Sequence, residues 1–355
     1  MNRVLLIHQD EVQHYRVSIY SYLSDYLKPY GFELTVASQG IETNDLRKEI
    51  HFNFTQGKLC LPNIIRLLDT LRPDIVILFV NPKNLYLFPL LFYLKLKGIK
   101  VVYWGHGIDL GHISSPKIYL NKLEHWIVDA IILYAGHLKE HIGRKLHYKV
   151  FIANNTLNTD AYKPNKVTGD YLLQKYGIQT KKNIVFMGRI QKRKRLHDLI
   201  AAHSMLNRND VGLIIAGPDT ESLLPEIKSG KNQFILGPVY GPDAMDLLSA
   251  CDVYCLPGHM GLSIVDAFYC GLPVVTENVP HAPEIMYLKN GINGFMVEKG
   301  DVKGLAEKIG LLLDDFALRQ KFSKAAKDSI QKEAHIDRLC EGFLAALQFV
   351  GCAAN

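Results

Sequence analysis

The most chemically distinctive segment of the chain is a group of cations that follows an apolar stretch. The apolar residues Ile184–Met187 predict a buried strand, and a helical pattern begins at Leu196. Between them lie five cations within seven residues: Arg189, Lys192, Arg193, Lys194 and Arg195. Gly188 allows the backbone to turn tightly, the planar guanidinium of Arg189 can hold two oxygens, and Lys194 adds a mobile point charge. Because such a cluster repels itself without an anion, the segment favours a phosphate site over a solvated basic loop.

A second segment, Leu256–Val275, has the pattern strand, glycine-containing loop, helix and strand. The start of its helix offers main-chain amides that can bind an anion with the help of the helix dipole: those of Met260, Gly261 and Leu262. About one turn into the helix, the carboxylate of Asp266 can accept hydrogen bonds from two hydroxyls of a vicinal diol. The alternatives are a solvent-facing aspartate and a Ser263 that only caps the helix.

Short apolar runs alternate with segments of helical period along the whole chain, which predicts βαβ units and parallel sheets. The strands expected in the first half are Val4–His8, Glu33–Ser38, Ile75–Val80, Val101–Trp104, Ala130–Tyr134 and Val150–Ala153. After the polar segment Asn154–Gly169 the alternation of apolar runs and helical segments begins again. The strands expected there are Ile184–Met187, Gly212–Ala216, Gln233–Leu236, Val253–Leu256, Pro273–Thr276 and Phe295–Val297.

This alternation predicts an α/β fold of two facing Rossmann-like, doubly wound domains. The first covers residues 1–163, the second covers residues 164–333, and the segment 334–355 is expected to form a helix that packs back on the first domain. Because parallel sheets bind ligands beyond the carboxyl ends of their strands, we expect the active site in a cleft between the two sets of strand-end loops.

Composition excludes several protein classes. A chain of 355 residues that is 48% hydrophobic and 21% charged is neither disordered, collagen-like nor a coiled coil. Its six cysteines form no C-x-x-C pair, which indicates reduced thiols and no zinc site. The apolar opening at residues 4–8 is too short for the core of a signal peptide, so a cytoplasmic protein is expected. The sequence contains no Asp-x-Asp, so no metal is expected on a diphosphate.

Positive charge is concentrated in the first half. Residues 1–165 carry 19 cations and 14 acids, giving +5, whereas residues 166–355 carry 22 and 21, giving +1. The apolar run Leu85–Leu94 is half the length of about 20 residues that a bilayer span requires. A basic domain beside this run could dock on anionic headgroups at the inner face of the cell membrane. A buried helix under a solvated surface is the favoured alternative, and the charge is too weak to indicate nucleic-acid binding.

The cationic segment resembles one found in retaining glycosyltransferase family 4, whose members have the GT-B fold. In that family it reads G-R-[LI]-x-x-x-K-G-x-x-x-L-I. The matching positions here are Gly188, Arg189, Ile190, Lys194, Leu199 and Ile200. One position departs from the pattern, because Arg195 stands where the family has its second glycine.

The second segment resembles the family's E-x-F-G-L-x-x-x-E-A-x-x-x-G-x-P-V-V. Matches occur at Gly261, Leu262, Ala267, Gly271, Pro273, Val274 and Val275, and Asp266 holds the place of the second glutamate. Gly258 stands where the first glutamate is expected. In the family that glutamate contacts hydroxyls of the donor sugar, so its loss points to a different donor, to another residue in the role, or to lost activity. We hypothesise that His259 takes part of the role.

The resemblance implies specific roles for the site residues. Arg189 and Lys194 would hold the diphosphate of a UDP- or GDP-linked sugar, Asp266 would hold the ribose hydroxyls, and the loop 237–240 would frame the base. The further donor-binding residues implied are Gly188, Gly217, Val239, Met260, Gly261 and Leu262. His106, which follows a strand of the first half, would lie near the donor sugar. A turn histidine bonded to the backbone explains His106 equally well.

The implied activity is metal-independent hexosyl transfer with retention of configuration, and no cofactor is needed beyond the nucleotide-sugar substrate. The acceptor would be a glycan or lipid-linked intermediate of cell-surface polysaccharide biosynthesis. Two other functions stay open. One is a catalytically silent GT-B subunit that binds a sugar nucleotide or a partner transferase, which Gly258 favours. The other is a nucleotide-sugar epimerase of the same architecture, which the match at residues 256–275 disfavours.

Overall fold

The structure is a computed structural model that describes residues 1–42, 50–79, 84, 86–108, 118–161, 163–165, 170–226 and 230–352. It divides into two compact units. Unit 1 consists of Met1–Ala161 and Ile336–Asn355, and unit 2 of Tyr162–His335. Val80, Leu85 and positions 166–169, which belong to segments discussed above, lie outside the described residues.

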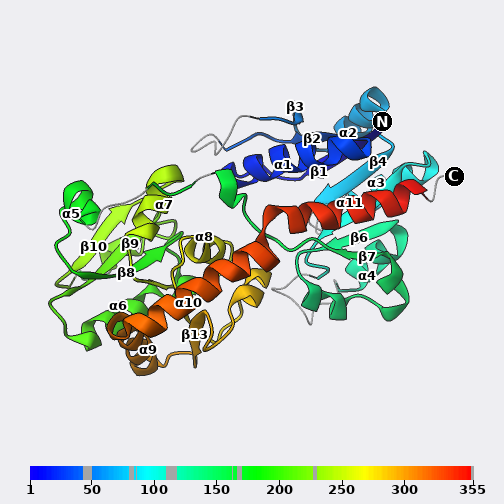
Figure 1. Cartoon of the computed structure of the whole chain (residues 1–355). Helices are drawn as coiled ribbons and strands as arrows, with labels where there is room; N and C mark the ends of the chain where they lie inside the picture. Colours follow the sequence, from blue (N-terminus) through cyan, green and yellow to red (C-terminus); the bar gives the residue numbers. More distant parts are fainter. Residues whose placement is uncertain are drawn as a thin grey trace. The chain divides into compact units, whose positions relative to one another are not determined.

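Unit 1 is built on a parallel sheet with the strand order β3-β2-β1-β4-β5-β6-β7 (Figure 1). Its strands are β1 (Asn2–His8), β2 (Phe32–Ser38), β3 (Asn53–Gln56), β4 (Ile75–Phe79), β5 (Lys100–Gly105), β6 (Ala130–Leu133) and β7 (Val150–Ile152). Its helices are α1 (His14–Leu27), α2 (Leu61–Leu71), α3 (Leu87–Leu96), α4 (Ile118–Ile127) and α11 (Ile336–Cys352). The C-terminal α11 packs against β6, β7 and α1, and so completes this unit.

Unit 2 is built on a second parallel sheet with the strand order β10-β9-β8-β11-β12-β13. Its strands are β8 (Lys182–Met187), β9 (Val211–Ala216), β10 (Gln233–Gly237), β11 (Val253–Cys255), β12 (Val274–Glu277) and β13 (Gly294–Val297). Its helices are α5 (Tyr171–Tyr176), α6 (Leu196–Leu206), α7 (Gly241–Ser249), α8 (Ser263–Tyr269), α9 (Val302–Asp314) and α10 (Phe316–Ser329).

Continuous apolar strands form the cores. In β1 the residues Val4–Ile7 are at most 1% exposed, and all six residues of β9 are buried. Such runs are typical of parallel strands that are covered on both faces by helices. Four leucines of α3 belong to the same kind of core, since Leu87, Leu90, Leu91 and Leu94 are fully buried, whereas Phe92 and Leu96 of this helix are exposed. The buried-helix interpretation of this run is therefore confirmed for these four leucines.

The strand order fixes where each sheet can bind a ligand. It reverses direction between β1 and β4 in unit 1, and between β8 and β11 in unit 2. Crevices for ligands lie at the carboxyl ends of the strands that flank such a switch point. In unit 2 these strands are β8, which leads into the cationic segment, and β11, which leads into the glycine-containing segment. Among the helices of the described residues, none is both long and apolar enough to cross a bilayer.

Candidate functional site

Two glycines allow a close approach of the main chain at the carboxyl edge of the sheet in unit 2. Gly188 directly follows β8 with a φ of +148°, and Gly217 directly follows β9 with a φ of +145°. A Cβ on Gly217 would lie 2.0 Å from the main-chain oxygen of Gly188. Both backbones therefore need glycine, because an L side chain would meet either strain or a clash. The two strand ends therefore approach each other closely at the carboxyl edge of the sheet.

The loops after β8 and β11 are bonded directly to each other. The amide of Gly258 donates to the oxygen of Lys194 at 3.0 Å, and the amide of His259 donates to the oxygen of Arg193 at 2.8 Å. The ammonium of Lys194 returns to the oxygen of His259 at 2.5 Å. A Cβ on Gly258 would lie 2.1 Å from the oxygen of Arg193. In this backbone arrangement no side chain can stand at position 258, so the missing glutamate is excluded by the close approach of the two loops.

The predicted cations differ in their surroundings. Lys194 is 9% exposed, and burial lowers its pKa to about 8, assisted by the charges of Arg193 and Arg189 and opposed by Glu284. Arg189 is exposed, and the structure shows no ion pair between it and any of the described residues. Its charge is therefore available to a ligand. The two cations lie near enough to each other for their charges to interact, as a diphosphate site requires.

A network of ion pairs holds the end of the loop after β8 in place. Arg195 adopts left-handed dihedral angles, with a φ of 54° and a ψ of 41°, which explains why the related pattern has a glycine here. Its guanidinium pairs with Glu277 at 2.8 Å and with Asp198 at 2.6 Å. Glu277 is fully buried and also accepts from the amide of Gly300 at 3.0 Å. The arginine thus connects the start of α6 to the end of β12.

The structure corrects the expectation for Met260. Its amide donates to Nδ1 of His281 at 3.0 Å, and its side chain is fully buried, so it has no free donor for an anion. The amides of Gly261 and Leu262 have no acceptor within the part of the chain that the structure describes. Of the three predicted amide donors, two therefore remain.

The histidines beside this loop are held in defined tautomers. Nε2 of His281 donates to the oxygen of Glu277 at 2.8 Å, which leaves Nδ1 as the acceptor for Met260. Nδ1 of His259 donates to the oxygen of Pro280 at 3.0 Å, so its free nitrogen is Nε2. Burial lowers the pKa of both rings. Both are neutral near pH 7, and His259 can offer one hydrogen-bond acceptor.

The remaining donor residues of unit 2 lie on the same edge. Asp266 is half-buried in the first turn of α8, and its charge adds to burial in raising the pKa of Tyr254. The hydroxyl of Tyr254 donates to the oxygen of Met187 at 2.7 Å, which places Asp266 near the end of β8. Val239 follows β10, whose last residue accepts from the amide of Gly217 at 2.8 Å. The carboxyl edge of this sheet thus gathers the predicted residues from four strands.

In unit 1 the predicted His106 follows β5 and packs edge-on against Tyr134, with the ring centroids 4.6 Å apart. The Tyr134 hydroxyl accepts from Nη2 of Arg16 at 3.3 Å. The guanidinium of Arg16 is buried over the rings of Phe79 and Trp104, and its Nε and Nη1 have no hydrogen-bond partner among the described residues. Sequence reasoning missed Arg16, because a single arginine in a helical pattern gives no signal. Arg16 is thus a buried cation at the carboxyl edge of the sheet in unit 1.

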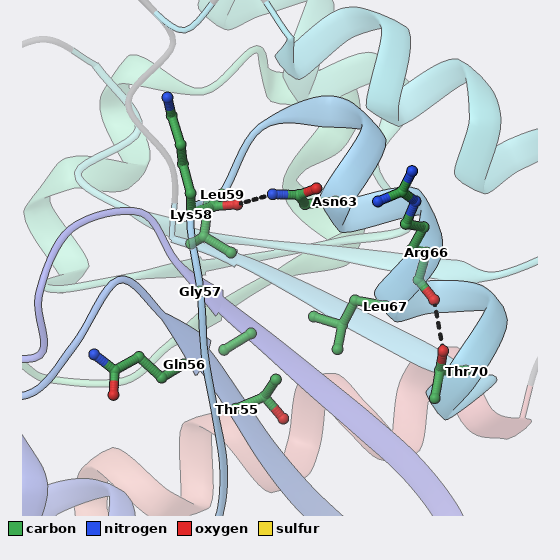
Figure 2. A pocket seen from close by; sticks show the side chains of 10 residues that line it. Thr55, Gln56, Gly57, Lys58, Leu59, Asn63, Arg66, Leu67 and Thr70 are labelled. Carbon is green, nitrogen blue, oxygen red and sulfur yellow. Dashed lines mark hydrogen bonds between the residues drawn. The ribbon is translucent and has the colours of Figure 1, made fainter.

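A cavity of about 280 Å³ lies elsewhere in unit 1, between the end of β3 and α2. Figure 2 shows the side chains that line it, with Lys58 and Arg66 at its rim and Thr55 and Leu67 inside. None of the site residues predicted from sequence lines this cavity. Within the described ranges, no group of three or more His, Cys, Asp or Glu residues is arranged to hold a metal ion.

Comparison with known proteins places this geometry in context. The family model described as "Glycosyl transferases group 1" matches residues 171–329. The capsular polysaccharide biosynthesis glycosyltransferase CapM of Staphylococcus aureus is 29% identical over 256 residues, 65% of this chain and 66% of that protein. N-acetyl-alpha-D-glucosaminyl L-malate synthase of Bacillus anthracis is 24% identical over 68% of this chain and 65% of that protein. The chain thus spans slightly under two thirds of either relative.

Solved structures show the same architecture. The crystal structure of Anabaena Alr3699/HepE in complex with UDP and glucose superposes with a TM-score of 0.76 at 18% identity, covering 98% of this chain and 100% of that one. At this identity the likeness shows the fold alone, which is the two-domain α/β fold of GT-B proteins. The match to the glycosyl transferases group 1 covers residues 171–329, which is most of unit 2 and less than half of the chain.

Proposed function

We propose that this protein is a retaining glycosyltransferase that transfers a hexose from a UDP- or GDP-linked sugar to a glycan or lipid-linked acceptor of cell-surface polysaccharide biosynthesis. Unit 2 holds the nucleotide sugar and unit 1 the acceptor. The observation that carries the proposal is the exposed Arg189, which forms no ion pair with the residues that the structure describes, beside Lys194, whose ammonium is bonded to the loop after β11. The sequence similarity to CapM and the fold shared with HepE, whose structure contains UDP and glucose, support it.

The chemistry follows from the charge that develops during transfer. As the bond between the sugar and the diphosphate breaks, negative charge grows on the departing nucleotide. Arg189, Lys194 and the amides of Gly261 and Leu262 stabilise that charge without rearrangement. Removing one such fixed donor costs about 3–4 kcal/mol of transition-state stabilisation. In a retaining transfer without an enzyme nucleophile, the acceptor attacks from the face that the nucleotide leaves, and a leaving phosphate oxygen takes its proton.

The remaining predicted residues have supporting roles. Asp266 accepts hydrogen bonds from the ribose hydroxyls, and Gly188, Gly217 and Val239 shape the edge on which the nucleotide lies. His106 of unit 1 contacts the donor sugar. Nε2 of His259 accepts one hydrogen bond from that sugar in place of the missing glutamate carboxylate, because position 258 cannot carry a side chain. No metal is needed, since the protein's own cations neutralise the diphosphate.

The experiment is a screen of nucleotide sugars with the full chain and a membrane-free glycan or lipid-linked acceptor. Release of UDP or GDP together with a product of the mass of acceptor plus hexose is expected, with full turnover in the presence of EDTA. Proton NMR of the new linkage reports whether configuration is retained. A nucleotide released with inverted configuration would overturn the retaining assignment, and turnover abolished by EDTA would overturn metal independence.

A catalytically silent nucleotide-binding subunit is the second candidate, and the exclusion of any side chain at position 258 favours it. The same screen separates the two functions. A silent subunit binds UDP or GDP in calorimetry but releases no nucleotide from any donor, even with acceptor present. Catalytic turnover with any donor rules the silent subunit out.

A further inference from the structure

The cavity between the end of β3 and α2 exists because small side chains of the sheet lie opposite the helix. Ala37 of β2 and Thr55 of β3 are partners in the parallel register, so their side chains stand next to each other on one face of the sheet. Both line the cavity, and α2 forms its other side. The small side chains at these two positions leave a space of about 280 Å³ under the helix.

The wall of the cavity offers hydroxyl and amide groups. Asn63, Arg66, Leu67 and Thr70 of α2 recur at a spacing of three and four residues, which places them on one face of the helix. Figure 2 shows that Nδ2 of Asn63 donates to the oxygen of Lys58, at 2.9 Å, and that the Thr70 hydroxyl donates to the oxygen of Arg66, at 2.8 Å. The side-chain oxygens of Asn63 and Thr70 accept no hydrogen bond from any described residue. They are therefore available to a ligand that carries hydroxyl groups.

The rim of the cavity carries only positive charge. Lys58 and Arg66 are exposed there, and neither forms an ion pair with the part of the chain that the structure describes. None of the residues that line the cavity is an aspartate or a glutamate. The planar guanidinium of Arg66 can hold a carboxylate or a phosphate through two parallel hydrogen bonds, and the ammonium of Lys58 adds a point charge. The rim thus favours an anionic group on the ligand.

The size and place of the cavity limit the ligand further. Its volume lies at the lower end of the range for ligand pockets, about 300–1,000 Å³, so it suits a single sugar ring better than a nucleotide. Leu59 and Leu67 add apolar surface for the C–H groups of such a ring. The cavity adjoins β3, which β2 separates from β1, so it lies about 10 Å from the switch point of this sheet at the usual strand spacing.

We propose that this cavity binds an acidic sugar residue of the acceptor glycan, namely a ring that carries a carboxylate or a phosphate. The proposal rests on the proposed function, in which unit 1 receives the acceptor. Arg66 and Lys58 hold the anionic group, and Thr55, Asn63 and Thr70 hold hydroxyls of the ring. Because the cavity lies away from the switch point, the accepting hydroxyl belongs to another residue of the same glycan. The protein thereby selects acceptors with an acidic residue near the end that is extended.

The test is a ligand-observed NMR titration of the full chain with saturating UDP present. The ligands are glucuronate, glucose 6-phosphate, glucose and inorganic phosphate. At least one of the two acidic sugars should bind about tenfold or more tighter than glucose and than inorganic phosphate, because only an acidic sugar engages both the rim and the wall. The tighter of the two identifies the anionic group. The proposal is wrong if neither acidic sugar binds, if glucose binds as tightly, or if inorganic phosphate binds as tightly.

Matched variants locate the binding. Lys58→Gln with Arg66→Gln should lower the affinity for the acidic sugar by about tenfold or more while the thermal unfolding curve stays as in the unchanged protein, since both side chains are exposed. The control pair Arg144→Gln with Lys145→Gln removes the same two charges from exposed positions of the short helical segment η3 (Arg144–Lys149) in unit 1. It should bind the acidic sugar as the unchanged protein does. Equal losses in the two pairs, or no loss in the first, would contradict the proposal.

A third variant tests the wall separately from the rim. Thr55→Val keeps the shape of a half-buried side chain and removes its hydroxyl, so it should weaken binding of the acidic sugar by about twofold to tenfold. Unchanged affinity in this variant would contradict the contact with the ring. UDP binding, measured alone, separates this proposal from the proposed function. A chain that binds UDP but no acidic sugar contradicts the cavity proposal alone, whereas one that binds the acidic sugar but no nucleotide contradicts the proposed function.

Discussion

The ammonium of Lys194 donates to the main-chain oxygen of His259 at 2.5 Å. This bond joins the two strand-end loops that flank the switch point of the sheet in unit 2, and two main-chain hydrogen bonds run alongside it. The cation is thereby fixed at the edge where a parallel sheet binds its ligand. The same approach of the two loops leaves no room for a side chain at position 258.

The first prediction concerns Gly258. Gly258→Ala should lower the free energy of unfolding by about 3 kcal/mol, at the upper end of the cost of overpacking, because the new methyl would overlap the oxygen of Arg193. Gly258→Glu should destabilise at least as much and should not raise any transferase activity. Thermal and denaturant unfolding of the full chain measure both.

Gly261→Ala is the matched control three residues away. A Cβ there would have its nearest neighbour, the Cβ of Ala282, at 3.7 Å, which is ordinary contact. This variant should unfold within about 0.5 kcal/mol of the unchanged protein. Equal stability of the alanine variants at 258 and 261 would contradict the close approach of the loops.

The second prediction is a pH dependence that belongs to Lys194. Its pKa lies at about 8 in the folded chain and at the ordinary 10.5 in the unfolded chain. The unfolded chain therefore binds more protons between these values, and the Lys194 contribution to the free energy of unfolding rises as the pH increases through that window. Affinity for UDP should move the other way, because the ammonium that holds the diphosphate is lost above pH 8.

The variant Lys194→Met tests whether this residue causes the pH dependence of UDP affinity. In the variant, UDP affinity should be lower at pH 7 and nearly constant from pH 7 to about pH 8.5, since over that range the nucleotide phosphates are already ionised and the uracil ring is still neutral. Calorimetric titration at several pH values gives both curves. If UDP affinity depends on pH in the same way in the variant and in the unchanged protein, Lys194 does not supply the positive charge that holds the diphosphate.

The third prediction concerns the left-handed Arg195. Arg195→Ala should lower the free energy of unfolding by about 3 kcal/mol or more, because it leaves the carboxylate of Glu277 buried without its cation. Arg195→Gly should cost about 1 kcal/mol less than Arg195→Ala, since glycine adopts a φ of 54° without strain. Adding Glu277→Gln to the glycine variant should restore part of the loss. If alanine and glycine are equally tolerated, the ion network does not stabilise the loop.

The fourth prediction assigns Asp266 to the ribose. Asp266→Ala should weaken UDP binding by about tenfold to a hundredfold, the range for hydrogen bonds to a charged group. Binding of inorganic pyrophosphate, which has no diol, should not change. Competition between the two ligands measures both affinities in one series. A loss for pyrophosphate as large as the loss for UDP would place Asp266 in the diphosphate site or in the fold.

Much of the architecture could be predicted from sequence, because it depends on apolar runs with a strong period. Each of the twelve expected strands overlaps an observed strand, although Val80 lies outside the described residues. The edge strand β3 was missed, since Asn53–Gln56 has one large apolar residue in four and lies at the end of the sheet. The short α5 was missed for a similar reason, because six residues are too few to show a helical period.

The site was harder to predict, because hydrogen bonding between distant loops leaves no sequence pattern. The position of Lys194 after a buried strand indicated a phosphate site, but its bond to His259 depends on contacts 65 residues apart. Met260 was expected to offer its amide, which instead donates to His281, a residue without a recognisable motif.

The most direct test of the central claim is a calorimetric titration of UDP and GDP into the full chain at pH 7, repeated with Arg189→Ala combined with Lys194→Met. The account predicts that at least one nucleotide binds the unchanged protein with micromolar affinity and that the double variant, though folded, loses a hundredfold or more of it. A folded double variant that binds the nucleotide as tightly as the unchanged protein would contradict the claim that these two cations hold a diphosphate.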